Sequence, residues 1–232
     1  MIDTNDVYKT VLFILNKEQR GYMTPAEFNK VAAQVQLEIF ESYFESLNQQ
    51  LRAPQNDSEY GDRVKSLRDR ISIFELATLL TPGGNGFDAP ADMHRTGLLE
   101  LVTSNGDAWE VQKTTAKQMS NIRRSKLTAP DLYNPIYHLF ENSFSIIGGA
   151  SIPGVRVRLN YIRKPKDPTW DYTIGALGEY VYTGGQDFEL SDIEQTEVVL
   201  RILTYAGIII RDPSIIQTAS TMAAAEDGNE KS

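Results

Sequence analysis

Residues 24–51, TPAEFNKVAAQVQLEIFESYFESLNQQL, are the stretch that most clearly indicates how this chain folds. Thr24 can cap a helix, Pro25 suits the first helical position, and Glu27 completes a capping box. The stretch therefore predicts one continuous helix over Pro25–Leu51, roughly 40 Å long at 1.5 Å per residue.

The apolar residues of this helix form two neighbouring stripes. The first stripe consists of Phe28, Val31, Ala32, Val35 and Ile39, and the second of Leu37, Phe40, Phe44, Leu47 and Leu51. A helix that is apolar over so wide an arc contacts more than one neighbour. We therefore expect it to be buried on two sides, with Phe40 in the core.

Two shorter helices are expected beside it. One face of the first carries Val7, Val11, Ile14 and Leu15. The third helix has a seam, spaced alternately by four and three, of Tyr60, Val64, Leu67, Ile71 and Phe74. That seam suits antiparallel pairing with the long helix inside one subunit. The end of the third helix is open, because residues 71–74 also suit a strand.

A β-rich part follows the loop at residues 81–86. Expected strands cover residues 98–103, 108–113, 136–141, 144–147, 155–162 and 179–183. Asn105-Gly106 is a strong hairpin signal between the first two. Residues 155–162 are the clearest strand, since apolar and polar residues alternate along it. Gly184-Gly185 is expected to end the last strand.

The C-terminal part is expected to be helical again. Ser191 and Glu194 form a capping box before a helix that ends near Gly207. Residues 214–225 suit a short second helix, and residues 226–232 are polar.

The residue period thus changes from 3.6 to 2.0 and back, which predicts an α+β fold. We expect an N-terminal helical hairpin, a β-rich middle, and a C-terminal helix with an extended tail. The corresponding parts are residues 1–82, 95–190 and 191–232, joined in one integrated subunit.

Composition restricts the function. The 232 residues include 41% hydrophobic and 23% charged residues, as in ordinary folded domains. No apolar run reaches the roughly 18 residues that cross a bilayer. The absence of cysteine excludes disulfides, thiolate nucleophiles and zinc–thiolate sites. A net charge of -8 argues against general phosphate-backbone binding, although an uneven charge distribution still permits a DNA-facing surface.

The sequence contains no convincing catalytic pattern. Asp88, Asp92 and His94 could hold a metal, but they lie near a Pro/Gly-rich loop without helical ligand spacing. His138 suits a hydrogen-bonded, partly buried imidazole. The glycines at 83–86 lack the lysine of a P-loop. We therefore expect that the protein is not an enzyme and that it has no cofactor and no metal site. A hydrolase that uses Asp88, Asp92 and His94 is a minor alternative.

Candidate interface residues lie on and after the clearest strand. The basic run consists of Arg156, Arg158, Arg163, Lys164 and Lys166. It could meet nucleic acid or an acidic protein; in an acidic chain we favour an intersubunit salt-bridge face. Trp170 and Tyr172 suit either an interface anchor or an ordinary apolar cluster.

The tail supplies two further candidates, Ile215 and Ile216. We expect the segment from Pro213 onward to dock on a neighbouring subunit, because it is more apolar than a frayed end. The alternative is a short helix folded back on its own subunit.

Three blocks resemble a virion structural protein of crAss-like and related tailed phages. Residues 15–29 are similar to its N-terminal pattern. Residues 135–137 and 157–170 resemble a strand ending in a Pro- and Trp-bearing turn, and residues 188–190 and 202–208 resemble its C-terminal helix. The blocks span nearly the whole chain in order, and their combination carries the resemblance.

The resemblance implies a connector or tail ring below the portal, through which DNA passes. It implies a homo-oligomeric ring, twelve-fold in that family, that contacts the portal and neighbouring tail or ring proteins. It also implies no sequence-specific DNA binding, no membrane, and a place in the virion after assembly in the bacterial cytoplasm. An acidic subunit suits a lumen in which DNA slides without sticking. A DNA-packaging or scaffolding accessory protein that binds nucleic acid or portal transiently is the alternative.

Overall fold

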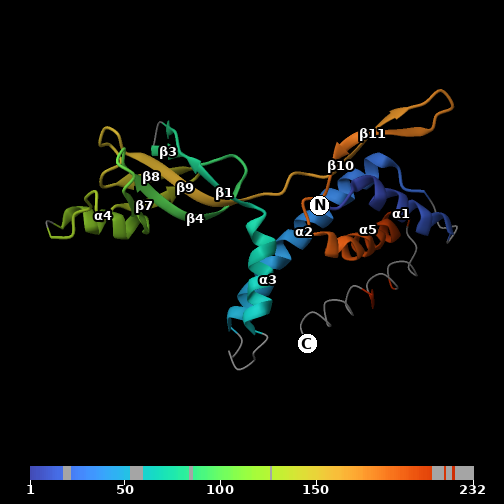
Figure 1. Ribbon diagram of the computed structural model, residues 1–232, viewed down its shortest axis with the longest axis horizontal. Coiled ribbons are helices and arrows are strands. Elements are labelled where there is room, and N and C mark those ends of the chain that lie inside the picture. Colours follow the sequence, from blue (N-terminus) through green and yellow to red (C-terminus); the bar gives the residue numbers. More distant parts are fainter. Residues whose placement is uncertain are drawn as a thin grey trace. The chain divides into compact units, whose positions relative to one another are not determined.

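The fold is α+β, as predicted, and the structure is a computed structural model (Figure 1). It describes residues 1–17, 22–52, 60–83, 86–125, 127–210, 217 and 221–222. Two compact units are present. The helical unit consists of Met1–Ile73 with Pro165–Ser232, and the β unit of Phe74–Lys164.

This division differs from the expected boundaries at residues 82, 95 and 190. The segment after residue 73 joins the sheets, and the segment after residue 164 returns to the helices. Among the described residues, an N-terminal segment (residues 1–73) and a later segment (residues 165–210) therefore build one unit. The two segments meet in a bridge between Ile2 and Phe188, and the Thr4 hydroxyl donates a 2.9 Å hydrogen bond to the Gln186 carbonyl.

The helical unit is assembled around one long helix. Its elements are α1 (Thr4–Lys17), α2 (Pro25–Arg52), α3 (Tyr60–Ser72), the hairpin β10 (Thr169–Ile174) and β11 (Tyr180–Gln186), the 3-10 turn η1 (Asp192–Glu194) and α5 (Gln195–Ile210). Helix α2 contacts α3, α5 and β10, which explains its wide apolar arc.

The capping box predicted for α2 is present. The Thr24 amide donates to Glu27 Oε2 at 2.9 Å, and the Glu27 amide donates to Thr24 Oγ1 at 3.3 Å. All of the first stripe is buried, as are Phe40 and Phe44. The ends of the second stripe are not: Leu37 borders an open groove and Leu51 is the penultimate residue of the helix.

Glu194, in η1, forms hydrogen bonds that connect η1 to α2 and α3. Its buried carboxylate accepts hydrogen bonds from the Tyr43 hydroxyl on α2, from Arg70 Nη1 on α3 at 2.9 Å, and from the Ser191 amide at 3.3 Å. Burial and the adjacent carboxylate raise the pKa of Tyr43, so its hydroxyl remains the donor.

Helix α5 continues beyond its expected end at Gly207. It reaches Ile210, and its core face of Val199, Ile202, Leu203 and Ala206 is buried as predicted. A glycine inside a helix costs about 1 kcal/mol. Here Gly207 is itself buried, so tertiary packing offsets the cost of placing glycine in the helix.

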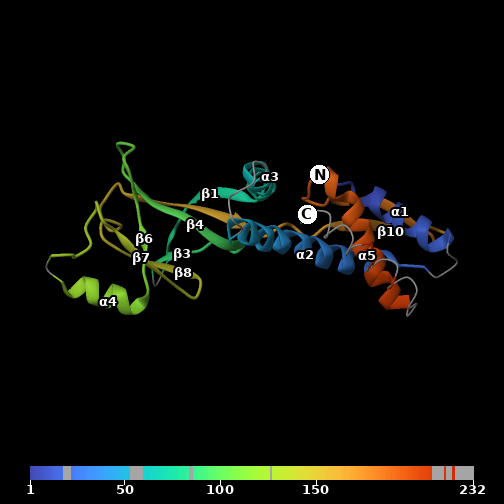
Figure 2. The ribbon, with the colours of Figure 1, turned by 90° about the horizontal axis from the view of Figure 1, so that it is seen from below.

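The described residues of the β unit form two sheets and one helix. Its elements are β1 (Glu75–Leu79), β2 (Pro82–Gly83), β3 (Gly86–Asp88), β4 (Met93–Val102), β5 (Ala108–Glu110), β6 (Gln112–Lys113), α4 (Ala116–Arg124), β7 (Ile136–Phe140), β8 (Ser143–Ile147) and β9 (Arg156–Arg163). The strand orders are β1-β9-β4-β5 and β2-β3-β8-β7-β6. Figure 2 shows α4 beside β7.

The predicted hairpin β4–β5 around Asn105-Gly106 is confirmed, and the strands expected at residues 136–141 and 144–147 form a second hairpin, β7–β8. The alternation in β9 is also confirmed, since Val157, Leu159 and Tyr161 lie in the core between the sheets. The ambiguous end of α3 resolves into a helix that stops at Ser72, followed by strand β1. This strand was not predicted, because ELATL lacks clear alternation; it forms by pairing with β9.

The prediction that Gly184-Gly185 would end a strand is wrong. Strand β11 runs through both glycines to Gln186, and its extra residue Thr183 makes the register shift opposite Asp171 and Tyr172. Gly185 has φ of 144°, and a Cβ there would lie 1.9 Å from the Thr169 carbonyl oxygen. Glycine thus permits the close approach that continues the ladder.

Candidate assembly surfaces

An apolar ladder follows one face of the β10–β11 hairpin. Tyr172 pairs with Tyr182, and Ile174 pairs with Tyr180, so these side chains share a face. With Trp170 they define the aromatic face. The Trp170 ring stacks with Tyr172 at 5.9 Å and with Tyr182 at 5.4 Å between centroids.

Exposure increases along this face toward the turn. Trp170 is 5% exposed, Tyr182 39% and Ile174 68%, and Leu177 in the turn is 94% exposed. Solvated large apolar side chains at adjacent positions are unfavourable unless a partner covers them. The outer half of the aromatic face is therefore a candidate protein contact.

Trp170 itself belongs to the core of the helical unit. Asn29 holds its backbone through two hydrogen bonds, from the Trp170 amide at 2.8 Å and to its carbonyl at 3.3 Å. The indole N–H donates to Asn5 Oδ1 at 3.2 Å, and the Tyr8 ring lies 4.6 Å away. Of the two interpretations kept for Trp170, the structure favours the apolar cluster, whereas half-buried Tyr172 continues onto the open face.

A recess opens between α1 and this hairpin, which lie alongside each other (Figures 1 and 2). Its volume is about 630 Å³, and it is lined by Tyr8, Lys9, Leu12, Tyr22, Trp170, Gly178, Glu179 and Tyr180. Burial, and then the Tyr22 hydroxyl, raise the pKa of Tyr8. A mainly aromatic wall with one cation and one anion suits apolar side chains of a partner.

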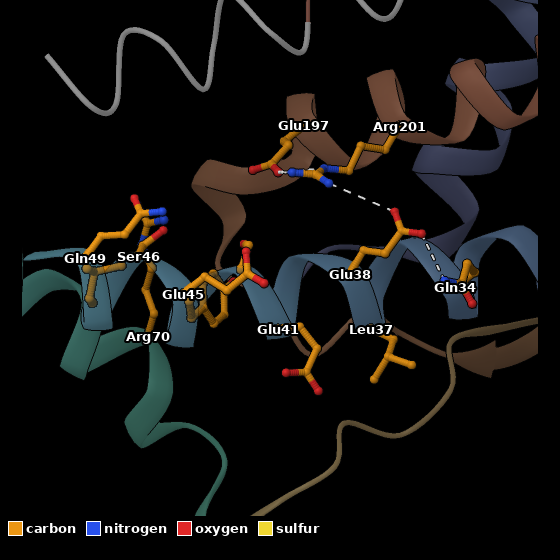
Figure 3. Close-up of a pocket in the computed structure, with 13 residues that line it drawn as sticks. Gln34, Leu37, Glu38, Glu41, Glu45, Ser46, Gln49, Arg70, Glu197 and Arg201 are labelled. Carbon is orange, nitrogen blue, oxygen red and sulfur yellow. Dashed lines mark hydrogen bonds and ion pairs between the residues drawn. The ribbon is translucent and has the colours of Figure 1, made fainter.

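A second hollow lies between α2, α3 and α5, with a volume of about 470 Å³ (Figure 3). Arg201 Nε donates to Glu197 Oε1 at 2.7 Å, and its Nη1 lies 4.0 Å from Glu38 Oε2. The Tyr205 hydroxyl also donates to Glu38. Figure 3 shows Glu41 pointing away from α5. Arg201 thus links Glu197 on α5 to Glu38 on α2, so these charges hold the two helices together rather than forming a convergent ligand site.

The basic run expected on one strand face is divided in the structure. Arg158 makes an intrachain ion pair with Glu100, with Nη2–Oε2 at 2.7 Å. Arg163 lies over the Phe74 ring at 5.6 Å and donates to the Lys164 carbonyl at 3.1 Å. Among the basic residues of this run that lie in the β unit, Arg156 and Lys164 are exposed.

Lys166 belongs to the other unit, where its amide donates to Glu189 and its carbonyl accepts from Gln36. Arg158 thus has an ion-pair partner within its own chain, and the intersubunit salt-bridge face stays a prediction. Ile215 and Ile216 lie outside the described residues, and their role in docking remains a prediction.

The residues considered for catalysis do not gather into a site. His138 Nδ1 lies 3.2 Å from the Thr114 carbonyl oxygen, so it donates a hydrogen bond, as expected for a satisfied imidazole. Asp92 accepts from the Tyr161 hydroxyl at 3.1 Å. Across the described ranges, no group of three His, Asp or Glu residues is placed to hold a metal ion. Likewise, none of the described helices is long and apolar enough to span a bilayer.

Comparison with known proteins assigns no family: no protein-family model and no curated protein matches this chain. The sequence indicated Trp170 and Tyr172 as candidates, but strand β10 and the rest of the aromatic face were not predicted. The signal was available, because Trp170-Asp171-Tyr172-Thr173-Ile174 and Tyr180-Val181-Tyr182 place large apolar residues at every second position.

Proposed function

We propose that this chain is a structural subunit of a phage virion, an oligomeric connector or tail ring between portal and tail through which DNA passes. The observation that carries the proposal is the aromatic face of the β10–β11 hairpin, with Ile174 and Leu177 solvated at its end. The three sequence blocks that resemble such a subunit support it.

A two-stranded ribbon is marginally stable by itself. Here its buried end is anchored through Trp170, while its outer end displays apolar side chains beside the recess. In a ring each subunit uses one surface to contact the next subunit and a different surface to contact the previous one. An apolar hairpin on one copy packed against a second copy supplies such a head-to-tail contact.

The proposed setting is the virion, assembled in the host bacterial cytoplasm, with the portal and adjacent tail or ring proteins as neighbours. The subunit acts by packing and has no catalytic step. DNA passes the ring without being read for sequence, which agrees with an acidic chain of net charge -8.

Electron microscopy and sedimentation of the purified full chain test the proposal. We expect closed rings that form with increasing concentration. The Ile174→Ser, Leu177→Ser double variant should remain monomeric with an unchanged melting temperature, because both side chains are solvated in the monomer. Leu127→Ser is the matched control, since Leu127 is 95% exposed but lies in the β unit.

Mass spectrometry of purified particles separates the proposal from its alternative. A connector remains in mature virions, whereas a scaffolding or packaging accessory leaves. A chain that is absent from particles and stays monomeric at every concentration contradicts the ring proposal.

A further inference from the structure

A cationic segment surrounds helix α4 and is distinct from the basic run on β9. It contains Lys113, Lys117, Arg123, Arg124 and Lys126. No aspartate or glutamate occurs from residue 111 to residue 130, although the chain as a whole carries a charge of -8. Charge is therefore strongly uneven along this chain, and one of its cationic parts is a short helix.

Local contacts place this helix at the surface of the β unit. A capping box starts it, in which the Thr115 amide donates to Gln118 Oε1 at 3.0 Å. Met119 is its buried residue and Ile122 is half-buried, so these two side chains face the unit, where α4 contacts β7. The opposite side of the helix remains solvated.

The outer face combines positive charge with uncharged hydrogen-bonding groups. Lys117, Ser120, Asn121 and Arg124 are spaced i, i+3, i+4 and i+7, which places them on one side of the helix, and all four are exposed. Exposed Arg123 flanks them. In the described part of the chain, no carboxylate forms an ion pair with Lys117, Arg123 or Arg124.

Helix stability accounts for only part of this arrangement. Arg123 and Arg124 in the last turn interact favourably with the helix dipole. Lys117, however, lies in the first turn, where the helix dipole disfavours a cation. The arrangement therefore fits an external anion better than the needs of the helix.

We propose that this outer face of α4 contacts the phosphate backbone of double-stranded DNA without reading its sequence. Lysine, arginine, serine and asparagine side chains are the usual donors to phosphate oxygens. A protein partner would require an apolar centre in the contact, and this face has none. The face spans roughly 10 Å, the length of about three phosphates along one strand.

The inference rests on the proposed function for its setting, since it assigns the surface of the ring subunit that meets the passing DNA. Three cations give weak, salt-sensitive binding, with a slope of log K against log salt of about -2.7. Such contacts guide a duplex and still allow it to slide. The binding itself requires no ring and can be measured on the monomer.

Fluorescence anisotropy with a labelled duplex of about 30 base pairs tests it on the full chain, from about 20 to 200 mM salt. We expect the wild type to bind with the slope given above. The K117Q/R123Q/R124Q variant should bind at least about tenfold more weakly at low salt, with a slope near zero. The control R156Q/K164Q/K166Q removes the same charge elsewhere and should stay within about threefold of the wild type.

Three results overturn the inference: no salt-dependent binding by the folded wild type, an equal loss in the control variant, or full DNA affinity in the α4 variant. If the α4 variant keeps its DNA affinity but loses assembly, the face is a protein contact. If the wild type binds DNA through α4 but never forms rings, the ring proposal fails while the α4 assignment stands. Circular dichroism confirms that each variant is folded.

Discussion

Replacing Glu194 with Gln tests whether one buried carboxylate holds α2, α3 and η1 together. Glutamine keeps the size of the side chain but removes its charge. It also presents an amide group to three donors, the Tyr43 hydroxyl, Arg70 Nη1 and the Ser191 amide. At least one of these donors then loses its acceptor, and Arg70 keeps its charge without a partner.

The cost follows from these contacts. A hydrogen bond to a charged group contributes about 1.5–3 kcal/mol, against about 0.5–1.5 kcal/mol for a neutral one. The hydrogen bonds from Tyr43 and Arg70 each become weaker by this difference, because glutamine has no charge. Because the Arg70 side chain is 24% exposed, water partly compensates its charge. We therefore expect a loss of about 2–3 kcal/mol in the free energy of unfolding.

Urea unfolding followed by the fluorescence of Trp170 measures this loss in the helical unit. The second tryptophan, Trp109, lies in the β unit, so a Trp109→Phe background isolates the signal. The midpoint should fall while the m-value stays constant. Glu45→Gln, an exposed carboxylate on the same long helix, is the control and should change stability by less than about 0.5 kcal/mol.

A double-mutant cycle with Arg70→Gln isolates the ion pair. If the Arg70–Glu194 ion pair stabilises the unit, the sum of the stability losses in the two single variants should exceed the loss in the double variant by about 1 kcal/mol or more. A Glu194→Gln loss below about 1 kcal/mol, or a coupling near zero, would refute the reasoning.

Three further predictions concern the long helix and the tail. Phe40→Ala should cost about 3 kcal/mol or more in urea unfolding, since its ring is fully buried; a loss near zero would contradict its place in the core. Thr24→Ala should cost about 1 kcal/mol at neutral pH. The hydrogen bonds from Thr24 lower the pKa of Glu27 in the folded state. The stability that the capping box contributes is therefore fully present above the pKa that Glu27 has in the unfolded chain, and it is lost as the pH falls through the pKa of Glu27 in the folded protein. The difference in unfolding free energy between the wild type and Thr24→Ala should therefore become smaller in acid. A difference that does not change with pH would count against the capping box. Deleting residues 213–232 should leave the monomer folded by circular dichroism and melting yet abolish attachment to the particle; normal assembly would exclude tail docking, and failure to fold would favour a helix folded back on its own subunit.

Local signals allowed much of the fold to be predicted. The start of α2 was predicted because Thr24 and Glu27 satisfy each other's backbone groups within four residues. The β4–β5 turn was predicted because Asn105-Gly106 adopts the required backbone conformation cheaply, with Gly106 at φ of 91°. Each of these features depends on neighbours in the sequence alone.

The candidate surfaces were only partly predictable. The sequence indicated a basic run on β9, but its pattern did not show that Arg158 would be neutralised by Glu100, 58 positions away. It indicated Trp170 as a candidate, but Asn29 and Asn5, which fix it in the core, lie 141 and 165 positions away. The acid-free stretch around α4 was visible in the sequence and was overlooked.

The sequence by itself determined the long capped helix and the Asn-Gly hairpin, whose energy is local, and the alternation that marks strand β9. Only the tertiary structure decided that β1 is a strand, because it obtains its backbone hydrogen bonds from the distant strand β9. It also decided that residues 1–73 and 165–210, as far as the structure describes them, build one unit around Glu194 and Trp170. Those contacts join residues far apart in the chain, and their energy exists only after the intervening segments have folded.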